Sequence, residues 1–236
     1  MNNSQFFINL NLKKWKINFI IISSGQTTPL FTKDINIEKF INNKKLLFEN
    51  IDKLLKEIIL EIERKFQNIF VNKVNLMIEN ISLNSIDLAL KENMENKSIS
   101  KSIIEYLIKD ARYQIIKNHP EKHITHIIIK KCLIDGEEYN YVPFESKCKN
   151  FIVDLSFIYL QKTFTSEIEK IFKNHQLEIN KIICTNYAKS LLNIDIDNVS
   201  KAGLTALEES NLNEVSITPK KKGKMGFFEK VFHIFS

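Results

Sequence analysis

The sequence predicts a mixed α/β protein. A long amphipathic helix pattern over 47–70 and several short runs rich in Ile, Leu, Phe and Val carry this prediction. The chain has 236 residues, of which 44% are hydrophobic and 26% are charged, which is enough to bury a core as one domain or two small ones. Because helical and strand patterns both recur along the chain, we expect a mixed α/β body.

The first third of the chain is predicted to begin with sheet. The runs 6–12 and 17–22 are rich in Phe and Ile and predict two adjacent strands or a β-hairpin. Over 47–70, apolar residues recur at intervals of three and four opposite Lys, Glu and Arg, which predicts one continuous helix. Apolar and polar residues then alternate over 74–78 and 86–90, so each of these segments is predicted to be a half-buried strand.

The middle of the chain continues the mixed pattern. A helix is predicted over 100–116, with His119-Pro120 as its stop. Asp135-Gly136, a dipeptide typical of tight turns, predicts a hairpin between 124–133 and 138–142. A strand at 151–160, a helix at 165–172 and a returning strand at 181–185 follow. From 194 to 223, polar residues and Pro219 predict a flexible linker.

The charge and cysteine content narrow the function classes. The net charge is +6, but Lys and Glu are interspersed, so no nucleic-acid partner is expected. A nucleic-acid binder is the weakest alternative, and it predicts that binding to DNA depends steeply on salt concentration. Cys132, Cys148 and Cys184 are odd in number and form no CxxC pair, which argues against a disulfide framework and favours a reducing cytoplasm. No signal peptide or transmembrane helix is predicted, because Lys16 and Asn18 interrupt the longest apolar run near the N-terminus.

The sequence offers two candidate chemical sites, a metal site and a cysteine nucleophile, and the pattern of residues around each favours a structural role. His119, His123 and His126, with Cys132, could bind a metal, but an i, i+3 pair such as His123 and His126 points to opposite faces of a strand. The histidines are therefore predicted to be solvent-facing residues at a strand entrance. Cys184 could be a nucleophile with His175, but its apolar segment predicts a core residue. The acidic residues of the long helix are predicted to form i, i+4 pairs with neighbouring Lys. No catalytic residue, metal site or cofactor is therefore expected.

The last residues predict an amphipathic membrane anchor. Helical spacing gathers apolar side chains on one face, and a lysine cluster precedes them, as in helices that lie in an anionic membrane surface. The predicted membrane-binding residues are Lys220, Lys221, Lys222, Lys224, Met225, Phe227, Phe228, Val231, Phe232, Ile234 and Phe235. The alternative is a terminal helix that docks on its own domain, or a fraying tail. One such helix holds reversibly, so self-association is expected to add avidity.

In the order of its elements, the chain resembles the FtsA family, actin-like proteins that tether the bacterial division ring to the membrane. Segment 7–14 lies where the family has its first strand and phosphate loop. Segment 126–139, with its Asp-Gly turn, resembles part of the inserted SHS2-type subdomain, and 220–236 resembles the basic C-terminal helix. A full family member is much longer, and this chain lacks a counterpart of the second half of the actin fold.

The resemblance implies a partial actin-like ATPase fold with four parts. They are the first actin-like subdomain at 1–80 with 165–193 returning to it, the inserted SHS2-type subdomain at 81–164, a linker at 194–223, and the membrane-targeting helix at 224–236.

The phosphate loop departs from the family pattern, which reads Asp-hydrophobic-Gly-Ser-Ser-Lys. Asn9 stands in place of the Asp, Asn11 in place of the Gly, and Leu12 and Lys13 in place of the two Ser; only Lys14 is kept. The carboxylate near the metal is lost, and so are the small residues that let backbone N–H groups approach phosphate. The second phosphate loop has no counterpart. The resemblance therefore implies a degenerate loop, no cofactor and no enzymatic activity.

The implied function is that of a non-catalytic cell-division protein, peripheral on the cytoplasmic face of the membrane. It would tether division-ring components and scaffold divisome proteins at the septum through the inserted subdomain. The implied partners are an anionic membrane surface, other cell-division proteins and further copies of the chain. The ring protein FtsZ is a weaker candidate, because the subdomain that contacts it in the family lies in the missing half. The alternative is a divergent actin-like ATPase that still binds ATP through Lys14.

Overall fold

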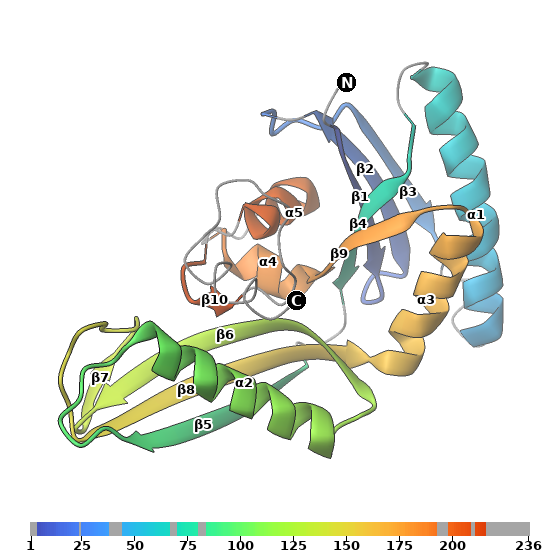
Figure 1. Cartoon of the computed structure of the whole chain (residues 1–236). Helices are drawn as coiled ribbons and strands as arrows, with labels where there is room; N and C mark the ends of the chain where they lie inside the picture. Colours follow the sequence, from blue (N-terminus) through green and yellow to red (C-terminus); the bar gives the residue numbers. More distant parts are fainter. Residues whose placement is uncertain are drawn as a thin grey trace. The chain divides into compact units, whose positions relative to one another are not determined.

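A computed structural model of the chain shows two compact units (Figure 1). The structure describes residues 4–23, 25–37, 44–66, 70–79, 84–192, 198–208 and 211–215. Unit 1 comprises Met1–Leu83 and Thr163–Ser210, and unit 2 comprises Asn84–Lys162 and Asn211–Ser236. Each unit combines a sheet with helices, so the predicted mixed α/β class is confirmed.

Unit 1 is built on a five-stranded sheet with the strand order β3-β2-β1-β4-β9. The strands are β1 (Ser4–Asn11), β2 (Lys16–Ser23), β3 (Phe31–Asn36), β4 (Lys73–Glu79) and β9 (Glu178–Cys184). The first three form an antiparallel meander, and β4 and β9 continue the sheet parallel to β1. The helices are α1 (Lys44–Lys65), α3 (Lys162–Asn174), α4 (Thr185–Ser190) and α5 (Val199–Leu207).

Helices cover both faces of this sheet: α1 and α3 lie on one side, and α4 and α5 on the other (Figure 1). Phe7 and Met77 pack against Ala202 and Ala206 of α5. Every residue of β4 after Lys73 is buried, so the prediction of a half-buried strand at 74–78 is wrong. Strands of a parallel sheet with helices on both faces lose the solvent-facing side that alternation implies.

The predicted linker is also corrected. Segment 194–223 contains α5 and the strand β10 (Glu214–Val215). Helix α5 begins after Asn198, whose side-chain oxygen accepts a hydrogen bond from the N–H of Lys201 at 2.9 Å. Its buried residues are Ser200, Ala202, Gly203 and Ala206. Such small residues give little hydrophobic periodicity, although they allow the helix to lie close to the sheet.

Unit 2 contains a second sheet with the order β10-β6-β8-β5, and β7 pairs with β6. Its elements are β5 (Ser85–Asn93), α2 (Lys101–Asn118), β6 (Lys122–Ile134), β7 (Glu137–Tyr139), β8 (Asn150–Gln161) and β10. Helix α2 packs on one face of the sheet through Ile104, Leu107, Ile108 and Ala111, against a core that includes Phe151 and Phe157 of β8. Among the described helices, none combines the length and the apolarity needed to cross a membrane.

The Asp135-Gly136 hairpin is confirmed between β6 and β7. Both residues have positive φ, +49° for Asp135 and +98° for Gly136, as tight hairpin turns require. The Asp135 carboxylate accepts hydrogen bonds from the backbone N–H groups of Asn150 and Lys149 at 2.8 and 3.1 Å. These two bonds lower the pKa of Asp135 and tie the turn to the start of β8.

Candidate functional site

A polar cluster lies at the carboxyl ends of the parallel strands of unit 1. Asn9 and Asn11 lie at the end of β1, Glu79 ends β4, and Thr185 and Lys189 belong to α4, which follows β9 directly. In open α/β sheets, ligands bind outside this edge. We call these five residues the strand-end cluster.

Asn9 is fully buried and uses both ends of its side-chain amide. Its Nδ2 donates to Oδ1 of Asn18 on β2 at 2.8 Å, and its Oδ1 accepts from Oγ1 of Thr185 at 2.8 Å. A buried amide is stable when it is hydrogen-bonded in this way, whereas an unpaired buried carboxylate is not. Asn9 therefore joins β1 to β2 and α4.

Asn11 caps the turn between β1 and β2. Its Oδ1 accepts hydrogen bonds from the backbone N–H groups of Lys13 and Lys14 at 3.1 and 2.8 Å. Its Nδ2 donates to Oε2 of Glu79 at 2.9 Å, and the N–H of Leu12 donates to the Glu79 carbonyl at 2.8 Å. Backbone N–H groups of such a turn are those that would bind phosphate in a phosphate loop. In this chain they bind the protein's own oxygens.

Glu79 and Lys189 form the charged part of the cluster. The Lys189 Nζ lies 3.0 and 3.1 Å from the two carboxylate oxygens of Glu79. The side chain of Glu79 is 9% exposed and that of Lys189 is 21% exposed, so the charges are largely removed from water. A pair of this kind is tolerated because each charge has a partner, and breaking it leaves one charge uncompensated.

The predicted loop residues thus divide into two groups. The structure brings Asn9 and Asn11 together with Glu79, Thr185 and Lys189. The sequence analysis selected the two asparagines but not the other three residues. Leu12, Lys13 and Lys14 lie in the turn itself, and the two lysine side chains are exposed. Glu79 could have been found from the sequence, because it is a carboxylate that directly follows an apolar run.

The predicted membrane-binding residues from Lys220 to Phe235 lie outside the described residues. The structure therefore leaves the membrane-anchor prediction as it stands.

The prediction of solvent-facing histidines is wrong for His126. Its side chain is fully buried, and its Nδ1 lies 2.7 Å from Oε1 of Glu214. The cause is β10, which pairs with β6 beside this position. A register shift between Ile124 and His126 also breaks the simple alternation along β6. Within the described part of the chain, no three His, Cys, Asp or Glu side chains gather as a metal site would require.

Two polar contacts of α1 differ from the predicted pairs along the helix. Asp52 accepts from Nε2 of His175 at 2.9 Å, and Glu61 pairs with Lys33 of β3. These carboxylates therefore join α1 to other elements of unit 1. Cys184 is buried, as predicted for a core residue, and burial raises the pKa of its thiol.

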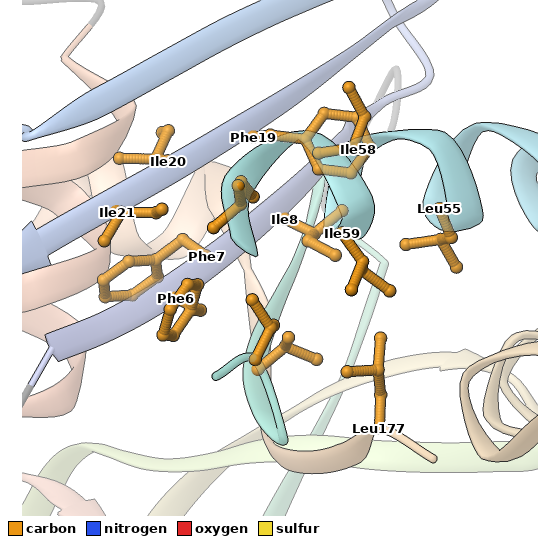
Figure 2. Close-up of a pocket in the computed structure, with 13 residues that line it drawn as sticks. Phe6, Phe7, Ile8, Phe19, Ile20, Ile21, Leu55, Ile58, Ile59 and Leu177 are labelled. Carbon is orange, nitrogen blue, oxygen red and sulfur yellow. The ribbon is translucent and has the colours of Figure 1, made fainter. Parts of the chain in front are cut away.

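A small apolar pocket lies between the sheet of unit 1 and α1 (Figure 2). The sheet contributes Phe6, Ile8, Phe19 and Ile21 to its walls, and α1 contributes Leu55, Ile58, Ile59 and Ile62. Binding sites combine an apolar lining with a few placed polar groups. The residues that line this pocket are all apolar, so the pocket is a small gap in the packing of the core.

No protein-family model and no curated protein matches the chain. Among solved structures, it is similar to the cytoplasmic domain of EpsL, an inner membrane component of the type II secretion system of Vibrio cholerae, with 12% identity and a TM-score of 0.38. That match covers 79% of this chain and 57% of the other.

Two further solved structures are similar over most of this chain. The PilM–PilN type IV pilus biogenesis complex gives 7% identity and a TM-score of 0.41, covering 80% of this chain and 49% of that chain. A Bacteroides thetaiotaomicron protein, described as having an actin-like ATPase fold and unknown function, gives 11% identity and a TM-score of 0.30, covering 80% and 56%.

The chain therefore spans about half the length of the solved proteins it matches. The chain itself has a mixed α/β fold, whose meander continued by parallel strands is consistent with a partial actin-like fold.

Proposed function

We propose that the chain is a non-catalytic, FtsA-like protein. It binds the cytoplasmic face of the membrane through residues 220–236, and its folded units bridge components of the division machinery. In this proposal it is not an enzyme and needs no nucleotide. Further copies and other cell-division proteins are its partners, and unit 2 takes the role of the inserted SHS2-type subdomain.

The observation that carries the non-catalytic part is the Asn11 cap. Its side-chain oxygen accepts from the N–H groups of Lys13 and Lys14, and Glu79 is engaged by Asn11 and Lys189. A nucleotide would have to displace these bonds before its phosphates could bind the turn. Removing a partner from a buried polar group costs about 1–3 kcal/mol for each group.

The sequence of the tail supports the membrane part. Lysines near an anionic leaflet contribute about 1 kcal/mol each, and the apolar side chains of 225–235 add to this when they are inserted. One helix of this kind binds reversibly, so several copies together would hold better than one.

Co-sedimentation with liposomes that contain anionic lipid tests the anchor. The full chain should pellet and the chain ending at Pro219 should stay in solution. Phe228→Glu and Phe232→Glu should each weaken binding. Phe70→Glu is the matched control, because Phe70 is 77% exposed on unit 1 and lies outside the tail. The membrane proposal fails if truncation leaves pelleting unchanged.

A divergent ATPase is the second candidate, and one observation favours it. Glu79 and Lys189 place a carboxylate and an ammonium group at the sheet edge where α/β proteins bind ligands. Isothermal titration with Mg-ATP decides between the two. Micromolar binding that Lys14→Ala abolishes would support the ATPase candidate, and release of phosphate from ATP would then have to be measured. The non-catalytic proposal expects no heat of binding up to millimolar nucleotide.

A further inference from the structure

Strand β5 of unit 2 is a long sheet edge. Among the strands that the structure describes, it ends its sheet and pairs with β8 alone (Figure 1). Its nine residues make it the longest of the strands that end the two sheets, β3, β5, β9 and β10. The pairing with β8 runs without a register shift, and β5 contains no proline. Edges of soluble proteins usually carry a bulge or a proline to prevent pairing with another chain.

The backbone ladder shows which groups of β5 face outward. The N–H of Tyr159 donates to the carbonyl of Asn84, and the N–H of Met94 donates to the carbonyl of Lys149, so these pairs bracket the ladder. In an antiparallel pair, residues alternate between bonding to the partner strand and pointing away from it. Even-numbered residues of β5 therefore bond to β8. The residues that point their N–H and C=O groups to the free edge are Ser85, Asp87, Ala89, Lys91 and Asn93.

We propose that this edge pairs with β5 of a second copy, antiparallel, with the two-fold axis at Ala89. In this register Asp87 lies opposite Lys91, Ser85 lies opposite Asn93, and Ala89 lies opposite itself. Each of these pairs has its backbone groups at the free edge. Because the two-fold axis repeats the first two pairs, five pairs form in all. Each exchanges two hydrogen bonds, which gives roughly ten between the chains. A two-fold interface uses the same surface on both copies, as this one does.

The side chains select this register. Asp87 pairs with Lys130 of its own chain at 3.0 Å, and with the axis at Ala89 it also meets Lys91 of the second copy as an opposite charge on both sides of the axis. Moving the axis to Asp87 or to Lys91 places two like charges directly opposite each other. On the other face of the strand, Leu88 lies opposite Leu90. Both leucines are only partly buried against the unit 2 core, so a second strand would cover them further.

This pairing supplies an interface for the self-association that is part of the proposed function, and it rests on the proposed function for that part alone. It requires neither a membrane nor a division protein, so it is measured in lipid-free solution. A failure there would remove this interface and leave the membrane anchor untouched. A failure of liposome binding would have the opposite consequence.

Sedimentation velocity of the full chain over a concentration series provides the first measurement. The wild type should show a concentration-dependent dimer. Ala89→Pro removes an N–H that points away from β8, so the fold should be kept while the dimer is lost. Ala89→Ser keeps that N–H and is the matched control, which should still dimerise. Circular dichroism and the Tm check that both variants fold.

Charge exchange provides the second test. Lys91→Glu and Asp87→Lys should each weaken self-pairing by about tenfold or more, because like charges then face each other. A mixture of the two variants should form a mixed dimer, since every facing pair is again of opposite sign. Lys53→Glu, on the exposed side of α1, is the control and should dimerise like the wild type.

Any one of the following results would overturn the proposal. They are a full chain that stays monomeric at all concentrations, an Ala89→Pro variant that dimerises like the wild type, and charge variants that fail to pair with each other. A chain that dimerises only when it ends at Pro219 would also overturn it, because the C-terminal segment would then be the occupant of the β5 edge.

Discussion

The side-chain amide of Asn11 donates a hydrogen bond to Glu79 at 2.9 Å, joining two buried residues that lie 68 positions apart in the chain. The same asparagine accepts from the N–H of Lys14 at 2.8 Å, and Glu79 also binds Lys189. One side chain thus couples the β1–β2 turn, the end of β4 and helix α4. The position that resembles a phosphate loop is held in place by contacts within the protein.

Asn11→Ala should therefore destabilise unit 1. It removes the cap of the turn and one partner of a buried carboxylate, and we expect a loss of about 1–3 kcal/mol in the free energy of unfolding. Urea denaturation measures the change. Asn72→Ala is the control, because Asn72 is exposed in the same unit. Equal midpoints for the two variants would contradict a structural role of Asn11.

Gly203→Val should be strongly destabilising if α5 packs as described. A Cβ at Gly203 would lie 2.7 Å from Cε1 of Phe7 and 2.9 Å from Sδ of Met77, and both side chains are fully buried. Overpacking of a core typically costs about 1–3 kcal/mol. Thermal unfolding should show a lower Tm for Gly203→Val and little change for the exposed control Lys201→Ala. A flexible segment at 199–207 would tolerate both substitutions.

Glu214→Ala should loosen β10 from the sheet of unit 2. The substitution removes the 2.7 Å contact with the buried His126, at the point where the strand pairs with β6. The N–H of Ile129 donates to the carbonyl of Asn213, so its hydrogen exchange reports on the attachment of this segment. We expect exchange about tenfold faster. Glu214→Gln keeps a hydrogen-bonding side chain and should show a smaller effect; equal rates in all three proteins would contradict the prediction.

The three cysteines should react slowly with thiol reagents in the native protein. Burial raises the pKa of Cys132 to about 12, and it also raises the pKa of Cys148 and of Cys184. Because the thiolate is the reactive form, a raised pKa lowers the reactive fraction at pH 8. Labelling at pH 8 should be slow in buffer and fast in 6 M guanidinium. A cysteine that reacts equally fast under both conditions would show that its site is open.

Local patterns were sufficient where an element carries its own signal. The three- and four-residue spacing of Leu and Ile predicted α1 and α2, although α1 ends at Lys65 and the prediction extended to residue 70. Asp135-Gly136 predicted the β6–β7 turn, because periodicity and positive φ are properties of neighbouring residues. Strand β3 and helix α4 were missed. Both are only six residues long, which is too short for a clear period.

Contacts between distant residues could be decided only by the tertiary structure. The sequence shows Asn9 and Asn11 as departures from a phosphate loop, but not that Thr185, Glu79 and Lys189 would satisfy them. The burial of His126 likewise depends on β10, which begins 88 residues later in the chain. The pairing of strands and the docking of helices set these contacts, and a one-residue change of register would exchange the two faces of a strand.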